Sequence, residues 1–276
     1  MRFGVSAVIL LSSLALLAGR PATADEAIRH WSAGSLKGAL TKVGAAFTAE
    51  TGIRVDQTWK ASGLIAKTIE GGEKVDVFTS ANMEHPLALQ KAGKMGPVVL
   101  FARNELCAFA MPRAGVAGDG SNLLARLLDP GVKLGTSTPK ADPAGDYAFG
   151  MFAKAETVAP GARAALEAKA LQLTGGPNSP PPPADRNVYA AQLASGAADV
   201  MLAYCTNAGP IAKELPDAKT VRLPPALAMR ADYGLTVAVD APPAAYRFAL
   251  FLLSPTAQAI LAEAGFGAPT LPSAAP

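Results

Sequence analysis

Residues 27–79 read AIRHWSAGSLKGALTKVGAAFTAETGIRVDQTWKASGLIAKTIEGGEKVDVFT, and this stretch decides the fold. Three short apolar runs, over residues 27–31, 53–59 and 75–79, have the character of buried strands. Between them lie two segments whose apolar residues recur at helical spacing. This alternation predicts an α/β fold, with a parallel sheet covered by helices on both faces.

A serine follows each of the first two predicted strands. Ser35 lies within WSAGSLK (residues 31–37) and Ser62 within WKASGLI (residues 59–65). Each is expected where a helix begins, beside N–H groups that lack intrahelical partners and at the positive end of the helix dipole. Ligands of such sheets bind beyond the carboxyl ends of the strands, so the two serines predict an anion pocket that needs no lysine or arginine. The alternative is that each serine is an ordinary helix N-cap.

Strand and helix patterns continue to alternate along the rest of the chain. Further strands are expected over residues 106–111, 133–136, 200–204, 219–223 and 233–239. Further helices are expected over residues 84–92, 123–128, from 147 onwards, 162–171, 188–194 and 244–264. Residues 175–183 are rich in proline and predict a stiff surface loop. Together these segments indicate two α/β lobes, the second inserted into the first.

The first 24 residues have the pattern of a cleavable export signal. Arg2 supplies a positive start, residues 5–17 form an apolar run too short to span a bilayer, and residues 22–24 (ATA) form a small-x-small cleavage site. No cysteine follows the expected cut, so we expect no lipid anchor. No later segment predicts a membrane span, and the mature protein is expected to be exported and soluble.

The charge balance excludes a strongly basic binding surface. The formal net charge is +3, and removal of Arg2 and Arg20 with the leader leaves about +1. We therefore expect neither nucleic acid nor a membrane surface as a partner.

Two cysteines and two histidines complete the reactive side chains. Cys107 and Cys205 both fall in predicted strands, and either form one disulfide or are two buried apolar residues. His30 and His85 show no metal-ligand spacing, so no metal site and no cofactor is expected.

Signals for an enzyme are weak. The chain has no Gly-x-Ser-x-Gly elbow, no Walker-type phosphate loop and no evident partner nucleophile for either histidine. The sequence therefore predicts a binding protein and not an enzyme. An exported hydrolase and an adhesive surface protein are the alternatives.

Eight short stretches occur in an order and spacing that point to one protein family. They are AGSL (33–36), FTAETG (47–52), ASG (61–63), AKTIEGG (66–72), VDVFTSA (75–81), PAG (143–145), GAAD (196–199) and LAY (202–204). Together they resemble the periplasmic molybdate-binding proteins of ABC importers. The resemblance implies a type II periplasmic-binding-protein fold, in which each lobe is a mostly parallel sheet flanked by helices and two crossing strands form a hinge. We place lobe 1 at residues 26–104 and 232–276, and lobe 2 at residues 105–231.

The resemblance also implies a set of ligand contacts. It assigns anion binding to Ser35 and Ser62 through side chain and N–H, to Ala144 and Arg186 through backbone N–H, and to Tyr204 through its phenol. A tetrahedral dianion offers only acceptors, which suits a pocket of neutral donors, whereas a carboxylate in the pocket would favour a protonated anion. The implied ligand is molybdate or tungstate, the implied partner is the membrane permease of an ABC importer, and a periplasmic monomer is expected.

Three positions depart from the family pattern. Thr138 stands where the family often has an acid, Arg186 where it usually has a small apolar residue, and Lys60 lies beside Ser62. If the Arg186 side chain enters the cleft, it pairs with a larger or more highly charged anion. Another oxyanion or a small anionic organic ligand is therefore the alternative to molybdate and tungstate. The other interpretation is a surface arginine with Asp185 as a local partner. For Tyr204 the alternative is a core residue, and for Ala144 a turn residue.

Overall fold

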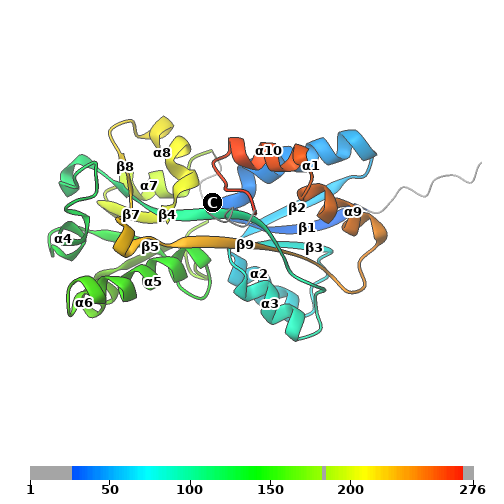
Figure 1. Ribbon diagram of the computed structural model, residues 1–276, viewed down its shortest axis with the longest axis horizontal. Helices are drawn as coiled ribbons and strands as arrows, with labels where there is room; N and C mark the ends of the chain where they lie inside the picture. The colour runs from blue at the N-terminus through cyan, green and yellow to red at the C-terminus, as the bar shows by residue number, and fades with distance from the viewer. Residues whose placement is uncertain (1–26, 182–184, 270–276) are drawn as a thin grey trace, which may run out of the picture.

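The computed structural model describes residues 27–181 and 185–269, and one mixed sheet runs through them (Figure 1). The predicted export signal at residues 1–24 lies outside these residues. The strands are β1 (Ile28–Ala33), β2 (Val55–Lys60), β3 (Val77–Ser80), β4 (Val99–Ala110), β5 (Leu134–Ser137), β6 (Leu171–Thr174), β7 (Val200–Tyr204), β8 (Lys219–Arg222) and β9 (Arg230–Val237). Their order is β2-β1-β3-β9-β4-β7-β5-β6, with β8 paired to β4.

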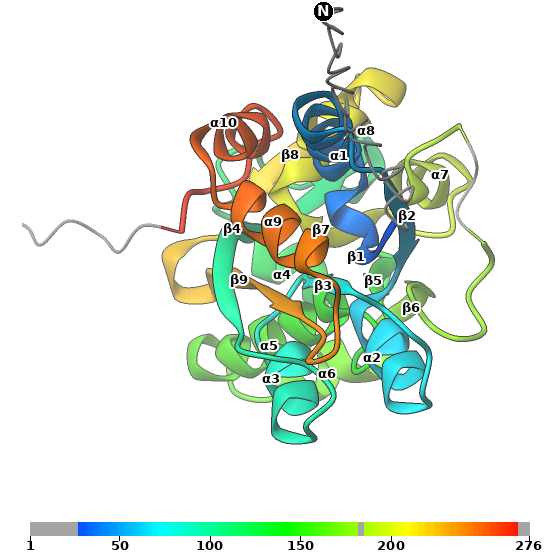
Figure 2. The ribbon, with the colours of Figure 1, turned by 90° about the vertical axis from the view of Figure 1, so that its right-hand side faces the viewer.

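The helices cover both faces of the sheet, as the views in Figures 1 and 2 agree. They are α1 (Lys37–Thr51), α2 (Ser62–Glu70), α3 (Glu84–Lys91), α4 (Leu123–Leu128), α5 (Pro143–Val158), α6 (Ala162–Lys169), α7 (Val188–Ala194), α8 (Ala208–Glu214), α9 (Pro243–Leu252) and α10 (Pro255–Glu263). Short 3-10 helices are η1 (Gly34–Leu36), η2 (Pro112–Ala114), η3 (Cys205–Asn207) and η4 (Pro225–Leu227). The predicted α/β class is confirmed.

The molecule has two halves that share the long strands β4 and β9 (Figure 1). The first half consists of β1 to β3 with α1 to α3, α9 and α10, and the second half of β5 to β8 with α4 to α8. β1 pairs in parallel with β2 and β3, and β5 pairs in parallel with β6 and β7. Between these parallel groups, β4 and β9 pair antiparallel and place Arg103 opposite Asp232.

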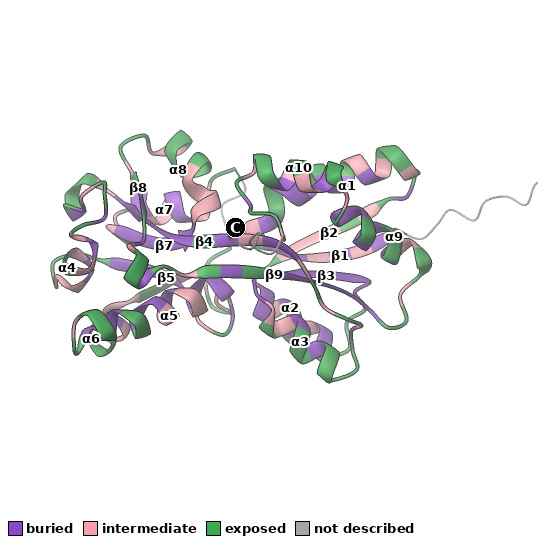
Figure 3. Ribbon diagram, in the orientation of Figure 1, coloured by how far each residue is buried: buried purple, intermediate pink, exposed green. Residues whose placement is uncertain are grey.

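The central strands are largely buried, the edge strands β2, β6 and β8 are mostly intermediate or exposed, and the outer faces of the helices are exposed (Figure 3). In the first half, the predicted helical stripe of Leu36, Leu40, Val43 and Phe47 is fully buried against the sheet. The same core cluster takes in Tyr204 from the second half, so the two halves share packing where they meet. Among the described residues no single helix qualifies as a membrane span; α9 and α10 do so only when taken together, across a 54° bend.

Two expected elements were wrong in detail. The single helix expected over residues 244–264 is two helices, because Pro255 offers no N–H to continue α9 and Ser254 caps α10 by accepting from the Ala257 N–H. The helix expected over residues 162–171 ends at Lys169, and Leu171–Thr174 instead extends the sheet as β6 beside β5.

Candidate functional site

The two halves touch where α2 begins. The Gly63 N–H donates to the carbonyl oxygen of Ala141 at 2.9 Å, which joins α2 of the first half to the turn before α5 of the second. A Cβ at position 63 would lie 2.2 Å from the Lys140 carbonyl oxygen, so only glycine permits this approach. We call the region around this contact the seam.

Ser62 is the first residue of α2 and is fully buried at the seam. Its Oγ accepts a hydrogen bond from the Ala81 N–H at 3.1 Å. The helix N-cap is Ala61, so Ser62 is not the ordinary N-cap that the sequence left open. Since a hydroxyl carries one proton and two acceptor sites, the Ser62 proton remains for a further acceptor.

Ser35 lies in η1, directly after β1, and is half-buried. Its Oγ lies 3.2 Å from the phenol oxygen of Tyr233, a fully buried residue of β9. The Tyr233 phenol also accepts a hydrogen bond from Asn104 Nδ2 of β4 at 3.3 Å. Ser35 caps no helix, because the N-cap of α1 is Leu36.

Tyr204 ends β7 and reaches across to the first half. Its phenol donates to the carbonyl oxygen of Ala81 at 3.2 Å, so Ser62 and Tyr204 bind the N–H and C=O of the same residue. Its ring packs against Tyr233 and Tyr147, at centroid distances of 5.5 Å and 6.1 Å. Burial raises the pKa of Tyr204 well above its usual value, so the phenol remains a neutral donor.

Ala144 is buried at the start of α5, and its N–H already has a partner. Asp142, the N-cap of α5, accepts from the Ala144 N–H through Oδ1 at 3.1 Å. Burial raises the pKa of Asp142 above its usual value. A Cβ at position 175 would lie 2.3 Å from Asp142 Oδ2, so Gly175 makes room for the carboxylate. The seam therefore contains an acid that the sequence prediction did not include.

The two cations considered from the sequence have partners elsewhere. The Arg186 guanidinium pairs with Glu214 of α8 at 3.1 Å and is 45% exposed, so its partner is not the neighbouring Asp185. The Lys60 ammonium lies 4.7 Å from the centre of the Trp31 ring. The structure thus brings Ser62, Tyr204 and Ala144 to the seam, connects Ser35 to Tyr204 through Tyr233, and directs the Arg186 side chain to α8.

The hydroxyl and histidine groups behind the seam form a buried structural network. His30 Nε2 lies 2.9 Å from Thr79 Oγ1, which donates to Ser32 Oγ at 2.8 Å. All three residues are fully buried, and burial lowers the pKa of His30 to about 3. In the described ranges, no group of three or more histidine, cysteine, aspartate or glutamate side chains is arranged to hold a metal ion.

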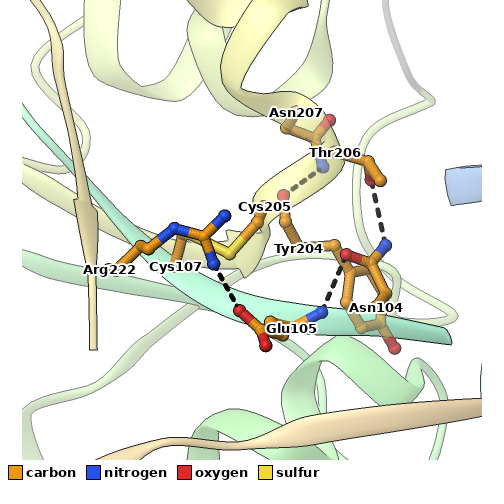
Figure 4. Close-up of a disulfide and its surroundings, with 8 residues drawn as sticks. All are labelled: Asn104, Glu105, Cys107, Tyr204, Cys205, Thr206, Asn207 and Arg222. Atoms are coloured by element: carbon orange, nitrogen blue, oxygen red, sulfur yellow. Dashed lines mark hydrogen bonds and ion pairs between the residues drawn. A yellow bond between two sulfur atoms is a disulfide. The ribbon is translucent and has the colours of Figure 1, made fainter. Parts of the chain in front are cut away.

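The structure joins Cys107 of β4 to Cys205 in a disulfide, with Cα atoms 4.9 Å apart (Figure 4). Cys205 directly follows Tyr204, and Cys107 lies three residues after Asn104. The covalent bond therefore ties the turn that carries Tyr204 to β4. A cavity of about 470 Å³ is lined by Asn104 of β4, Asp232 of β9 and Cys205, among others.

Sequence reasoning missed three polar residues of this region: Asn104, Tyr233 and Asp142. Asn104 and Tyr233 lie in strands that meet only in the fold, and neither has a local signature. Asp142 carries a signal that was available, because an aspartate directly before proline is typical of a helix N-cap with proline in the first turn.

Chemically, the seam is a set of neutral donors with one carboxylate beside it. Its donors are two serine hydroxyls of the first half, together with the Tyr204 phenol and the Ala144 N–H of the second half, which donate to the Ala81 carbonyl and to Asp142 in this structure. Such a set suits a ligand that offers acceptors, and the buried Asp142 favours one that also carries a proton.

The sequence matches one protein family over most of its length. A family model described as "Bacterial extracellular solute-binding protein" matches residues 28–267. The uncharacterized protein PM1146 of Pasteurella multocida is 34% identical over 208 residues, which cover 75% of this chain and 86% of that protein.

Two solved structures are also similar. The Azotobacter vinelandii periplasmic molybdate-binding protein superposes with a TM-score of 0.68 at 20% identity, over 89% of this chain and 100% of that one. The sulfate-binding protein SubI of Mycobacterium tuberculosis superposes with a TM-score of 0.70 at 18% identity, over 87% of this chain and 86% of that one. The ligands of these two proteins differ, so the likeness shows the fold alone.

Proposed function

The chain belongs to the bacterial extracellular solute-binding protein family, and on that premise we propose that it binds a tetrahedral oxyanion at the seam. The proposed ligand is molybdate or tungstate, and the proposed contacts are Ser35, Ser62, Ala144 and Tyr204, with Arg186 contributing its backbone N–H. The loaded protein delivers the anion from the periplasm to the permease of an ABC importer. Its role is binding and not catalysis.

One observation carries this proposal. The buried Ser62 Oγ accepts from the Ala81 N–H, which leaves the serine proton as a donor at the place where both halves meet. An oxyanion has lone pairs and no proton to offer, so it satisfies such a donor. A second hydroxyl, on Ser35, lies in the same half after the neighbouring parallel strand.

The position of the cations supports an anion held by neutral groups. The Lys60 ammonium lies over the Trp31 ring, and the Arg186 guanidinium pairs with Glu214, so each of these two cations has a partner within the protein. A dehydrated dianion between oriented dipoles is the arrangement that the resemblance implies. The similar fold of a molybdate-binding and a sulfate-binding protein agrees with an oxyanion as the ligand class.

The Asp142 carboxylate favours a second candidate ligand, an oxyanion that carries a proton. An ionised carboxylate beside Ala144 repels a dianion, whereas a proton shared between Asp142 and the ligand stabilises both. A protonated oxyanion, such as phosphate or a phosphate monoester, is therefore the alternative ligand.

The strand pair β4 and β9 is proposed as the hinge between two lobes. Arg103 and Asp232 face each other in register, and their side chains form an ion pair at 3.1 Å. An anion that contacts both halves has higher affinity for the closed arrangement and therefore shifts the population toward it.

Titration calorimetry with molybdate, tungstate, sulfate, phosphate and glycerol phosphate tests this function. We expect binding of molybdate and tungstate, and an at least tenfold loss in Ser62→Ala, because a hydrogen bond to a charged group is worth about 1.5–3 kcal/mol. Ser254→Ala is the matched control, since Ser254 also accepts a backbone N–H at a helix start but lies outside the seam.

The outcomes separate the alternatives. If only phosphate or glycerol phosphate gives a heat of binding, the ligand is a protonated oxyanion and not molybdate or tungstate. Unchanged affinity in Ser62→Ala would move the site away from the seam. No binding of any of these anions would reject the oxyanion class.

A further inference from the structure

We propose that Asn104 is a positioning residue that sets the direction of the hydrogen bonds leading to Ser35, so that Ser35 gives its proton to the anion. The chain of contacts runs from Asn104 through Tyr233 to Ser35. The inference rests on the proposed function, because it concerns the same site. Asn104 does not contact the ligand itself.

The first step is the orientation of the Asn104 amide. The Glu105 N–H, which is only a donor, lies 2.9 Å from Asn104 Oδ1 (Figure 4). The amide oxygen must therefore face Glu105, and the amide nitrogen must face the other side. Asn104 is 5% exposed, so the protein and not water fixes this orientation.

The second step is the phenol of Tyr233. Both protons of Asn104 Nδ2 have acceptors, because Nδ2 lies 3.3 Å from the Tyr233 phenol and 3.0 Å from Thr206 Oγ1. Tyr233 accepts from Asn104 and has a single proton of its own. Its other polar neighbour is Ser35 Oγ at 3.2 Å, so that proton is given to Ser35.

The third step is Ser35. Because Ser35 Oγ accepts from Tyr233, its own proton is left for another acceptor. The Ser62 hydroxyl is left with a free proton in a more direct way, because its oxygen accepts from the backbone N–H of Ala81. Both serines thus become donors to one ligand, and in Ser35 this depends on an amide two hydrogen bonds away.

Asn104 also holds the turn that carries Tyr204. Its second Nδ2 proton goes to Thr206, two residues after Tyr204, and the disulfide at Cys205 fastens the same turn to β4 (Figure 4). Asn207 Nδ2 donates to the Tyr204 carbonyl oxygen at 3.1 Å. The Asn104 side chain therefore contacts both Tyr233, which binds Ser35 of the first half, and Thr206, which lies in the turn after Tyr204 of the second half.

The variant Asn104→Asp tests the direction of the hydrogen bonds that run from Asn104 through Tyr233 to Ser35. The introduced carboxylate keeps the shape of the amide and can still accept from the Glu105 N–H, but it has no N–H for Tyr233. When ionised, it accepts the Tyr233 proton, Tyr233 then accepts from Ser35, and the serine presents a lone pair to the anion. We expect affinity at pH 8 to fall at least about tenfold. It should recover toward wild type at pH 5.5, because burial at this position raises the pKa of the introduced carboxyl so that it takes up a proton.

A double-mutant cycle with Tyr233→Phe separates the relay from simple charge repulsion. Repulsion between the introduced carboxylate and the anion acts with or without the phenol, whereas the relay needs it. We expect the loss caused by Asn104→Asp to shrink to about threefold or less in the Tyr233→Phe background. An equal loss in both backgrounds would overturn the proposal.

Affinity is measured by calorimetry with tungstate and sulfate at both pH values, beside wild type, with thermal melts as a check of folding. If Asn104→Asp fails to fold, Tyr233→Phe alone decides, because the relay predicts an affinity loss of about threefold to tenfold and wild-type affinity would refute it. A wild-type protein that binds none of the anions named under the proposed function, phosphate and glycerol phosphate included, rejects the proposed function and this inference together. Binding by wild type with a pH-independent, wild-type affinity in Asn104→Asp rejects the inference alone.

Discussion

The two halves of the candidate site hold their hydrogen-bond donors differently. In the first half, Ser62 accepts from the Ala81 N–H, and in the relay proposed above Ser35 accepts from the Tyr233 phenol, which leaves both serine protons for a ligand. In the second half, the donors are already used, because Asp142 accepts from the Ala144 N–H and the Ala81 carbonyl accepts from Tyr204. The first half is therefore arranged to give protons, while the second half must exchange one partner for another when it binds.

This difference has a physical consequence for affinity. Contacts from the first half add to the protein's own hydrogen bonds, whereas each contact from the second half replaces one that is worth about 1 kcal/mol. We therefore expect the serines to dominate the binding energy and the second half to adjust selectivity and closure. Four variants test this comparison.

The largest effect is expected from Gly63→Ala, which separates the two halves. Its Cβ would lie 2.2 Å from the Lys140 carbonyl oxygen, so α2 cannot approach the turn before α5. Because Ser62 directly precedes Gly63 in α2, the displacement also moves this serine. An anion that bridges the seam then loses the Ser62 contact together with its second-half contacts, and calorimetry should show an affinity loss of about a hundredfold. Gly38→Ala is the control, because nothing lies within 4 Å of its new Cβ. Near-wild-type affinity in Gly63→Ala would contradict a site at the seam.

A smaller effect is expected from Tyr204→Phe, which removes one donor of the second half. The loss should be about tenfold or less, since the phenol exchanges the Ala81 carbonyl for the ligand. Tyr246→Phe is matched to it, because its phenol also lies by a backbone carbonyl, that of Ala238, outside the site. A loss larger than that of Ser62→Ala would reverse the proposed order of the two halves.

A gain is expected from Asp142→Asn, which keeps the helix cap and removes the carboxylate. Affinity for a dianion at pH 7.5 should rise a few-fold, roughly 0.5–1 kcal/mol. Wild-type binding should weaken as the pH rises through the raised pKa of Asp142, and the variant should lose this slope. Asp119→Asn, an exposed acid, serves as the control. Weaker binding by Asp142→Asn would favour the protonated ligand instead.

The same residue makes a prediction about stability. Because the folded-state pKa of Asp142 lies above its unfolded value, its stabilising contribution is complete below the unfolded pKa and is lost as the pH rises through the folded pKa. Urea melts between pH 3.5 and 7 should therefore show wild type losing free energy of unfolding relative to Asp142→Asn as the pH rises. If the free energies of unfolding of wild type and Asp142→Asn change with pH in parallel, the pKa of Asp142 is not raised.

The smallest effect is expected from Arg186→Ala. The guanidinium pairs with Glu214 and is 45% exposed, so its removal should change affinity less than about twofold and stability by less than about 1 kcal/mol. A tenfold loss of affinity would place this side chain in the site and would favour a larger or more highly charged ligand.

Much of the fold was predictable because its signals are local. The alternation of strand and helix over residues 27–79 follows from hydrophobic periodicity, and helix α1 ends at Gly52, whose φ of 74° suits glycine. The break between α9 and α10 was also signalled locally, by Ser254 and Pro255, and was missed because the apolar spacing continues through it. Strand β6 had no such signal, since its pairing with β5 decides its structure.

The candidate site was predictable to a lesser extent. Ser35 and Ser62 were identified because each directly follows a predicted parallel strand, a position with a known relation to the sheet edge. Asn104 and Tyr233 were not, because they meet only through the antiparallel pairing of β4 with β9. The partner of Arg186 was assigned to Asp185 by proximity in sequence, whereas helix α8 supplies Glu214.

The sequence by itself determined the α/β class, and it singled out two serines as candidate ligand contacts and two cysteines as a possible disulfide, because periodicity, helix starts and residue counts are properties of short segments. Only the tertiary structure decided which way the hydrogen bonds at the seam run and which donors are already used. The physical reason is that a hydroxyl gives its one proton to the best acceptor nearby, and those acceptors come from segments far apart in the chain. The direction of a donor is therefore a property of the packed core.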